Sequence, residues 1–131
     1  MRAWMFAAAL LVACNGGGDD KSTEGDDTDD TTSGDPRVEA ILALTADAAS
    51  GQGLYDEECA LCHATDGTGG IGTSFVEELS EHADELDEEK EEWIGTVING
   101  VDGTSMAAYG DTYSDQEIAD IMGYIFATFA P

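Results

Sequence analysis

Two cysteines and a histidine lie within five consecutive residues of this chain, and this cluster limits the fold more than any other feature. The stretch reads Cys59-Ala60-Leu61-Cys62-His63. If it is helical, its two thiols lie about one turn apart and the imidazole follows from the same turn. A disulfide, a metal site, a redox dithiol and a covalent haem anchor all use such residues. The rest of the sequence has to decide between these four chemistries.

The flanking residues favour the haem anchor. A redox dithiol of this spacing expects neighbouring strands, but the preceding segment is Ala-rich with helical periodicity. A structural zinc site needs four nitrogen or sulfur ligands. The two cysteines, His63 and His82 would supply four, but the sequence has no second paired-ligand motif. A plain disulfide has no use for His63. Two spaced cysteines followed directly by histidine are the attachment pattern of c-type haem.

The first residues have the pattern of an export signal. Arg2 precedes an apolar run that is shorter than the roughly 20 residues needed to span a membrane, but long enough for a signal peptide. Residues 11–14, LVAC, resemble the lipobox of bacterial lipoproteins, in which the cysteine takes a diacylglycerol. We therefore expect a signal peptide at 1–13 and lipidation of Cys14, which also accounts for the odd cysteine count. An ordinary signal peptide with an incidental cysteine is the alternative.

An acidic linker is expected after the lipidated cysteine. From Asn15 to Pro36 the sequence contains no large apolar residue, so this segment cannot offset the entropy that ordering would cost. Its random-coil reach is roughly 26 Å. The predicted organisation is a signal peptide at 1–13, the lipidated cysteine and linker at 14–36, and a folded domain at 37–131.

The net charge of the chain limits the classes of molecule that it is expected to bind. The chain has 29 acidic and 4 basic residues, with a formal net charge of −25. This excess excludes nucleic acid as a partner and disfavours electrostatic docking on anionic lipid. It favours redox proteins with basic docking faces, steered at long range. Surface carboxylates that serve only solubility, for example in a salty habitat, are the alternative.

Periodicity predicts an all-α domain. We expect a helix from about Asp47 into His63, with a separate turn before it, and then a loop at residues 67–72. Gly100 stands where a helix C-cap glycine belongs. Ser114 and Glu117 form a capping box for a last helix. No segment has the alternation of strands joined by hairpin turns. The apolar stripe of the last helix is Ile118, Ile121, Met122, Ile125 and Phe129.

The segments around the haem motif resemble a known family in their order and spacing. Gly51 and Tyr55 precede Cys59 as a glycine and an aromatic residue do in the N-terminal helix of class I cytochromes c, where they cross the C-terminal helix. Residues 93–100 resemble that family's helix before the sixth-ligand loop. Residues 105–125 resemble its methionine loop and closing helix.

This resemblance spans residues 47–129 and implies a small cytochrome c-like fold, with helices wrapped around one covalently attached haem c. It implies that Cys59 and Cys62 form the thioether bonds and that His63 is the proximal iron ligand. The family usually has a Gly-Pro in the loop after the haem motif, whose carbonyl orients the proximal histidine. Residues 70–73 of this chain contain no proline.

Met106 is the expected distal iron ligand. It lies in a predicted loop among small residues that allow close approach to a ring. Met5 leaves with the signal peptide, Met122 belongs to an apolar stripe where methionine is usually core filler, and His82 lies in a charged segment. An empty or water-filled position is the alternative. Where the family usually has proline after the ligand, this chain has Ala107.

Six-coordinate iron leaves no open position for a substrate, so we expect electron transfer rather than an enzyme. The expected function is a monohaem c-type cytochrome that carries single electrons between redox partners. A lipid would tether it on the periplasmic or cell-envelope face of a bacterial membrane. Trp93 and Tyr109 are candidates to hydrogen-bond a haem propionate, although aromatic core is the alternative for Trp93. Two other functions stay open: a haem subunit of a larger oxidoreductase, and a peroxidase or gas sensor if Met106 is labile.

Overall fold

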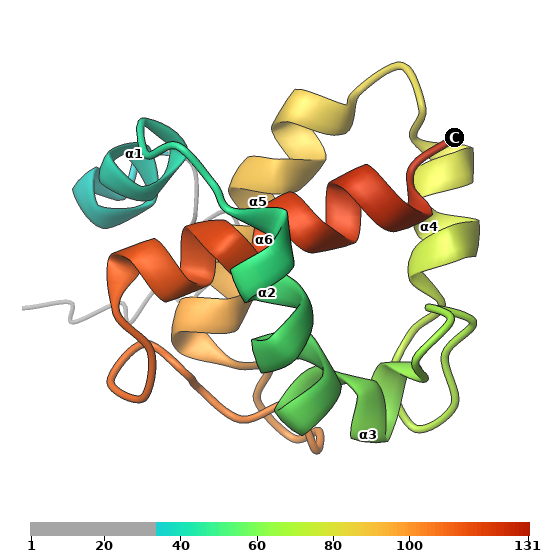
Figure 1. The fold of residues 1–131 in the computed structure, drawn as a ribbon. Coiled ribbons are helices and arrows are strands. Elements are labelled where there is room, and N and C mark those ends of the chain that lie inside the picture. The colour runs from blue at the N-terminus through green and yellow to red at the C-terminus, as the bar shows by residue number, and fades with distance from the viewer. Residues whose placement is uncertain (1–33) are drawn as a thin grey trace, which may run out of the picture.

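A computed structural model describes residues 34–131, and within them every regular element is a helix (Figure 1). The predicted all-α fold is confirmed. The predictions on the signal peptide, on Cys14 and on the linker up to residue 33 lie outside the described residues. The elements are α1 (Pro36–Leu42), α2 (Ala48–Leu54), the π-helical turn η1 (Tyr55–Cys59), α3 (Ala60–His63), α4 (Phe75–Glu81), α5 (Leu86–Asn99) and α6 (Asp115–Phe129).

Three of these elements form one unbroken helical run that ends in the cysteine–histidine motif. The run begins after Asp47, whose side chain accepts hydrogen bonds from the backbone N–H groups of Ala49 and Ser50. It continues through α2, η1 and α3 to His63, as predicted. The wide turn η1 was not predicted. In it the N–H of Ala60 donates to the carbonyl of Tyr55, five residues back, whereas an α-helix bonds four residues back.

The run is held in place where α2 crosses α6 (Figure 1). A Cβ added at Gly51 would lie only 1.8 Å from the carbonyl oxygen of Asp120, so no larger residue fits between these backbones. One turn later Tyr55 is fully buried, with its ring 5.2 Å from that of Tyr124 and 5.6 Å from that of Phe129. The glycine and the aromatic residue therefore make the crossing that the resemblance implied.

A buried carboxylate adds a polar tie at the same crossing. Asp120 is 7% exposed, and its Oδ1 accepts hydrogen bonds from the backbone N–H of Asp47 and from Nε2 of Gln116, each at 2.8 Å. A buried polar group needs such partners, because leaving it unpaired would cost about 1–3 kcal/mol. The start of α2 is thereby fixed to the first turns of α6.

The remaining helices close the core. The predicted capping box opens α6: the N–H of Ser114 donates to Glu117, and the N–H of Glu117 donates to the Ser114 hydroxyl. The C-cap of α5 is Gly100, at φ +69°, also as predicted. Within residues 34–131, no helix combines the length and apolar character that crossing a membrane would require. The largest fully buried side chains are Tyr55, Ile41, Leu79, Ile94, Ile118, Ile121, Ile125 and Val38.

Candidate haem site

A cavity of about 410 Å³ opens between the cysteine–histidine motif, α5, α6 and the loop that follows α5. This volume is within the range of sites that hold small molecules and cofactors. Its wall includes the predicted ligands from distant parts of the chain. Apolar side chains from α4, α5 and α6 make up much of the remainder. The predicted site residues on the wall are Cys59, Cys62, His63 and Met106, and the apolar ones include Phe75, Trp93, Val97, Ile121, Met122 and Ile125.

The imidazole of His63 is held by a backbone carbonyl and an aromatic ring. Its Nδ1 lies 2.9 Å from the carbonyl oxygen of Thr73. Because a carbonyl only accepts, Nδ1 carries the hydrogen and the lone pair of Nε2 stays free to bind a metal. The ring of Phe75 stacks on the imidazole at 4.2 Å, with 16° between the planes. Neither partner was predicted, and the Thr73 carbonyl takes the role that a proline-containing loop has in the resembled family.

Gly72 makes this approach possible. A Cβ at this position would lie 2.5 Å from Cε1 and 2.7 Å from Nδ1 of His63. The loop is folded back on the motif by its own backbone: the N–H of Gly72 donates to the carbonyl of Cys62, and the N–H of Gly69 donates to that of His63, both at 2.9 Å. We call residues 62–75 the proximal wall. Every contact described for the imidazole comes from this stretch.

A strained residue ends α3 directly after the histidine. Ala64 has φ +64° and ψ 155°, and it is the one non-glycine residue with positive φ among residues 34–131. This region is essentially confined to glycine, and occupying it costs of order 1–3 kcal/mol. The hydroxyl of buried Tyr55 donates to the carbonyl of Ala64 at 2.7 Å. The packed ring thus holds the peptide at the point where the chain leaves the motif.

The thiol chemistry argues against a redox dithiol. Cys59 and Cys62 are free thiols. Burial, followed by the charges of Glu58 and Cys62, raises the pKa of Cys59 to about 11. Redox-active cysteines of this spacing have a lowered pKa, because the thiolate is the reactive form. The microenvironment of Cys59 is the opposite of that.

Met106 is carried by the loop of residues 100–114, which we call the distal loop. The N–H of Val101 donates to the carbonyl of Met106 at 3.0 Å, closing a turn around the methionine. The N–H of Tyr109 donates to the carbonyl of Val97 on α5 at 2.8 Å. A Cβ at Gly100 would lie 2.8 Å from the carbonyl oxygen of Met106. The loop therefore lies directly on the glycine cap of α5, although no proline follows the methionine.

Comparison with known families adds to this geometry. Residues 46–125 match the family described as cytochrome C oxidase, cbb3-type, subunit III. The chain belongs to this family. It is therefore a haem-binding electron-transfer cytochrome, of the kind that the resemblance implied. No curated protein matches the chain. The matched residues contain the motif and the distal loop, and they leave out α1.

The cavity of this cytochrome fits a haem. Two thiols and an imidazole with a free Nε2 share its wall with a methionine, which is the donor set of a His/Met haem. The apolar lining suits a porphyrin. Gly72 lets the loop backbone pack against the imidazole, where any Cβ would collide with the ring.

Of the other candidate ligands within the described residues, Met122 belongs to the core and His82 has carboxylate neighbours. Met122 is 2% exposed in the core, as expected of a core methionine, and it also reaches the cavity wall. His82 follows α4, with its Nδ1 3.4 Å from a carboxylate oxygen of Glu89. Across residues 34–131, no group of three or more His, Cys, Asp or Glu side chains is arranged to hold a metal ion.

The two aromatic candidates for propionate contacts both line the cavity. Trp93 packs on Phe75, with ring centroids 5.0 Å apart, so it also belongs to the aromatic packing that was the alternative. Tyr109 stacks on Tyr113 at 5.7 Å. Burial, followed by the charge of Glu58, raises the pKa of Tyr109.

Proposed function

We propose that this cytochrome holds one haem c covalently and carries single electrons between redox partners. The observation that supports this most strongly is the one cavity whose wall includes both cysteines, His63 and Met106. In this proposal Cys59 and Cys62 would form the thioethers, and Nε2 of His63 and the sulfur of Met106 would bind the iron. The bound haem supplies one-electron chemistry.

The chain's own residues hold and shield that group. The carbonyl of Thr73 fixes the hydrogen of the imidazole on Nδ1, which orients the ring and raises its basicity as a ligand. Phe75 limits rotation of the imidazole by stacking on it. The apolar side chains that make up much of the cavity wall would pack against the bound ring and reduce its contact with water.

Substitution of the methionine tests the ligand assignment. In the holoprotein, Met106→Ala is expected to convert low-spin iron to high spin, measured by absorption spectroscopy. The matched control is Met122→Leu, since Met122 also lines the cavity but keeps its volume and apolar character in this exchange. Low-spin iron that survives in Met106→Ala rules out Met106 as the ligand. Haem that acid acetone extracts from the wild-type protein rules out covalent attachment.

The surface near the cavity supports a basic redox partner. Leu61, within the motif, is 74% exposed, and Ile71, in the loop after it, is 76% exposed and lines the cavity. Glu58, Glu78 and Glu92 bring carboxylates to the same wall. Exposed apolar side chains together with acidic ones are complementary to a partner that presents apolar and basic residues.

Salt dependence tests this charge complementarity. The rate of reduction by the cation hexaammineruthenium(II) is expected to fall with ionic strength, because screening weakens attraction to the acidic surface. With the anion ascorbate as reductant, the rate is expected to rise, because screening weakens repulsion from the acidic surface. Equal salt dependence with the two reductants contradicts the proposal.

We propose, further, that Cys14 takes a lipid and tethers the protein on the periplasmic or cell-envelope face of a bacterial membrane. The apolar start of the chain and its LVAC sequence support this. Cys14→Ser is expected to move the cytochrome from the membrane fraction to the soluble fraction. A Cys14→Ser protein that stays in the membrane fraction contradicts the tether.

A second candidate, a haem subunit of a larger oxidoreductase, is favoured by the family description, which names an oxidase subunit. Size-exclusion chromatography of membranes dissolved in mild detergent distinguishes the two functions. A mobile carrier elutes alone, whereas a subunit elutes with the larger complex.

A further inference from the structure

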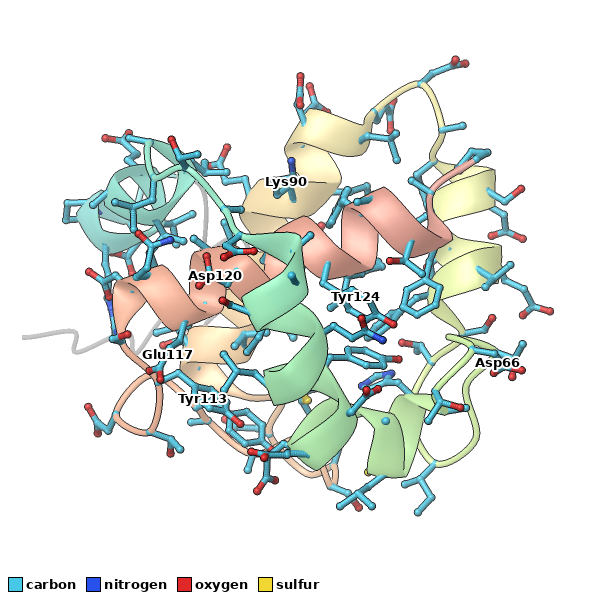
Figure 2. The ribbon with its side chains drawn as sticks, viewed as in Figure 1. Asp66, Lys90, Tyr113, Glu117, Asp120 and Tyr124 are labelled. Atoms are coloured by element: carbon cyan, nitrogen blue, oxygen red, sulfur yellow. The ribbon has the colours of Figure 1, made fainter. Side chains whose placement is uncertain are left out.

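Arg37, on α1, binds the distal loop at two points and the first residue of α6 at a third. Its Nε donates to Oδ1 of Asp115 at 2.8 Å. Its Nη2 donates to the carbonyl of Gly110 at 2.7 Å and, more weakly, to that of Tyr113 at 3.5 Å. Tyr113 lies beside Glu117 at the start of α6 (Figure 2). One guanidinium therefore joins α1 to the end of the distal loop and to the first residue of α6.

The peptide of Gly110 is the centre of this arrangement. Its carbonyl accepts from Arg37, while its N–H donates to the carbonyl of Ile98 on α5 at 3.1 Å. A Cβ at Gly110 would lie 2.9 Å from the Ile98 carbonyl oxygen and 3.0 Å from Nη1 of Arg37. The glycine lets both helices reach one peptide, four residues after Met106.

The helix that presents Arg37 is itself firmly packed. Val38 is 0% and Ile41 is 1% exposed, and α1 contacts both α5 and α6. Arg37 and Lys90 are the only lysine or arginine residues after residue 33. One of these two cationic side chains therefore donates its hydrogen bonds to carbonyls of the distal loop. The family match begins at residue 46 and leaves α1 out. The helix that presents Arg37 therefore lies outside the matched region, whereas its partners in the distal loop lie inside it.

We propose that α1 acts as a clamp on the distal loop and that Arg37 is a positioning residue for Met106. This inference rests on the proposed function, in which Met106 ligates the iron. The clamp opposes the loop movement that would carry the methionine away from the cavity. It takes the place of the rigidity that a proline after the methionine would supply, since Ala107 stands there.

The carbonyl contacts, rather than the ion pair, carry the expected effect. The side chains of Arg37 and Asp115 are 33% and 47% exposed, and ion pairs this exposed contribute little. Hydrogen bonds from a charged donor contribute more. Loss of the guanidinium is expected to raise the population of the open loop about tenfold.

The experiment compares Arg37→Ala with Lys90→Ala in the oxidised holoprotein. Lys90 lies on α5, far from Tyr113 in Figure 2, with its Nζ over the ring of Phe126. Its substitution removes the same charge without touching the distal loop. The rate at which added imidazole displaces the methionine is expected to rise about tenfold in Arg37→Ala and to stay unchanged in Lys90→Ala.

Hydrogen exchange provides a second measurement that does not depend on the iron. The amides of Tyr109 and Gly110, both bonded to α5 carbonyls, are expected to exchange about tenfold faster in Arg37→Ala. Arg37→Lys keeps the charge and the stem but loses the planar fork, so its rates are expected to fall between those of the wild type and Arg37→Ala. If Arg37→Ala folds poorly, Arg37→Lys replaces it in both measurements.

The outcomes separate this inference from the proposed function. Unchanged exchange of these amides in Arg37→Ala overturns the clamp, whatever the iron ligand is. If Met106→Ala speeds imidazole binding and Arg37→Ala does not, the positioning role fails while the ligand assignment stands. If Met106→Ala has no effect on imidazole binding, the ligand assignment fails, and faster exchange in Arg37→Ala still supports a clamp on the loop.

Discussion

The proximal wall and the distal loop present the two proposed iron ligands by different means. On the proximal wall, the hydrogen-bond partner and the stacked ring of the His63 imidazole both come from residues 62–75, so neighbours in sequence are also partners in space. The distal loop is held by hydrogen bonds to carbonyls of α5 and by Arg37 of α1. Arg37 lies far from Met106 in the sequence. The first arrangement is encoded locally, whereas the second forms only when helices distant in sequence have packed. We therefore expect the distal loop to be the more easily disturbed of the two.

The largest effect on the free energy of unfolding is expected at the crossing of α2 and α6, because this crossing supports both the proximal wall and the distal loop. Gly51→Ala would bring a Cβ to 1.8 Å from a backbone oxygen, and separating the helices is expected to cost about 3 kcal/mol of unfolding free energy. Gly53→Ala, in the same helix, has nothing within 4 Å of its new Cβ and is expected to gain about 0.5–1 kcal/mol. Urea denaturation of the two holoproteins measures both values. Equal effects would show that the crossing is not tightly packed.

A second substitution is expected to disturb the proximal wall alone. Gly72→Ala would place a Cβ against the His63 ring and is expected to cost about 2 kcal/mol through overpacking. In Gly70→Ala the nearest atom would lie 3.4 Å away, so little change is expected. The measurements are urea denaturation and hydrogen exchange at Tyr109. Faster exchange at Tyr109 in Gly72→Ala would contradict the independence of the two sides.

Acid is expected to have the smallest effect, and to act on the distal side through Glu117. Backbone and side-chain hydrogen bonds from Ser114 lower the pKa of Glu117. A lowered folded-state pKa stabilises the protein above the unfolded value of about 4.3, and this contribution is lost as pH falls through the folded value. The stability difference between the wild type and Glu117→Gln should therefore be present at neutral pH and shrink in acid.

A carboxylate on the proximal wall provides the matched control. Hydrogen bonds from Thr68 likewise lower the pKa of Asp66, which lies far from Glu117 in Figure 2. Asp66→Asn is expected to lose its own acid-dependent contribution without changing exchange at Tyr113 and Ile118. Glu117→Gln is expected to speed exchange at both amides, since the N–H of Ile118 donates to the carbonyl of Ser114 and Tyr113 directly precedes that cap residue. Faster exchange in Asp66→Asn together with unchanged exchange in Glu117→Gln would contradict an acid response that acts through the distal side.

Much of the fold was predictable because it depends on apolar residues that recur at helical spacing and on residue types that begin or end helices. The stripe of α6, its capping box at Ser114 and the glycine after α5 all have local physical causes, and all are present. The motif and Met106 could be predicted to face one another because few side chains bind iron, and they line one cavity. The roles of these residues toward a haem stay predictions.

What could not be predicted depends on backbone atoms and distant packing. The partner of His63 is a carbonyl of Thr73, and every residue has a carbonyl, so the sequence does not single it out. Gly72 was a weak signal of close approach. The partners of Arg37 are again carbonyls, contributed by a loop far along the chain. The break between α4 and α5 also went unpredicted, because the acidic residues around it are compatible with one continuous helix.

The wide turn η1 separates two tasks within one helical run. Each residue advances an α-helix by about 100°, and η1 accommodates one residue more per hydrogen-bonded turn than the helix on either side. Gly51 can therefore face α6 while the cysteines and His63 face the cavity. The segment between Gly51 and Cys59 therefore fixes the direction in which the motif faces around the helix axis, as well as its distance from the crossing of α2 and α6. Losing a single residue from it would turn the whole attachment motif about a quarter of the way around the helix axis, with every side chain of the motif still present.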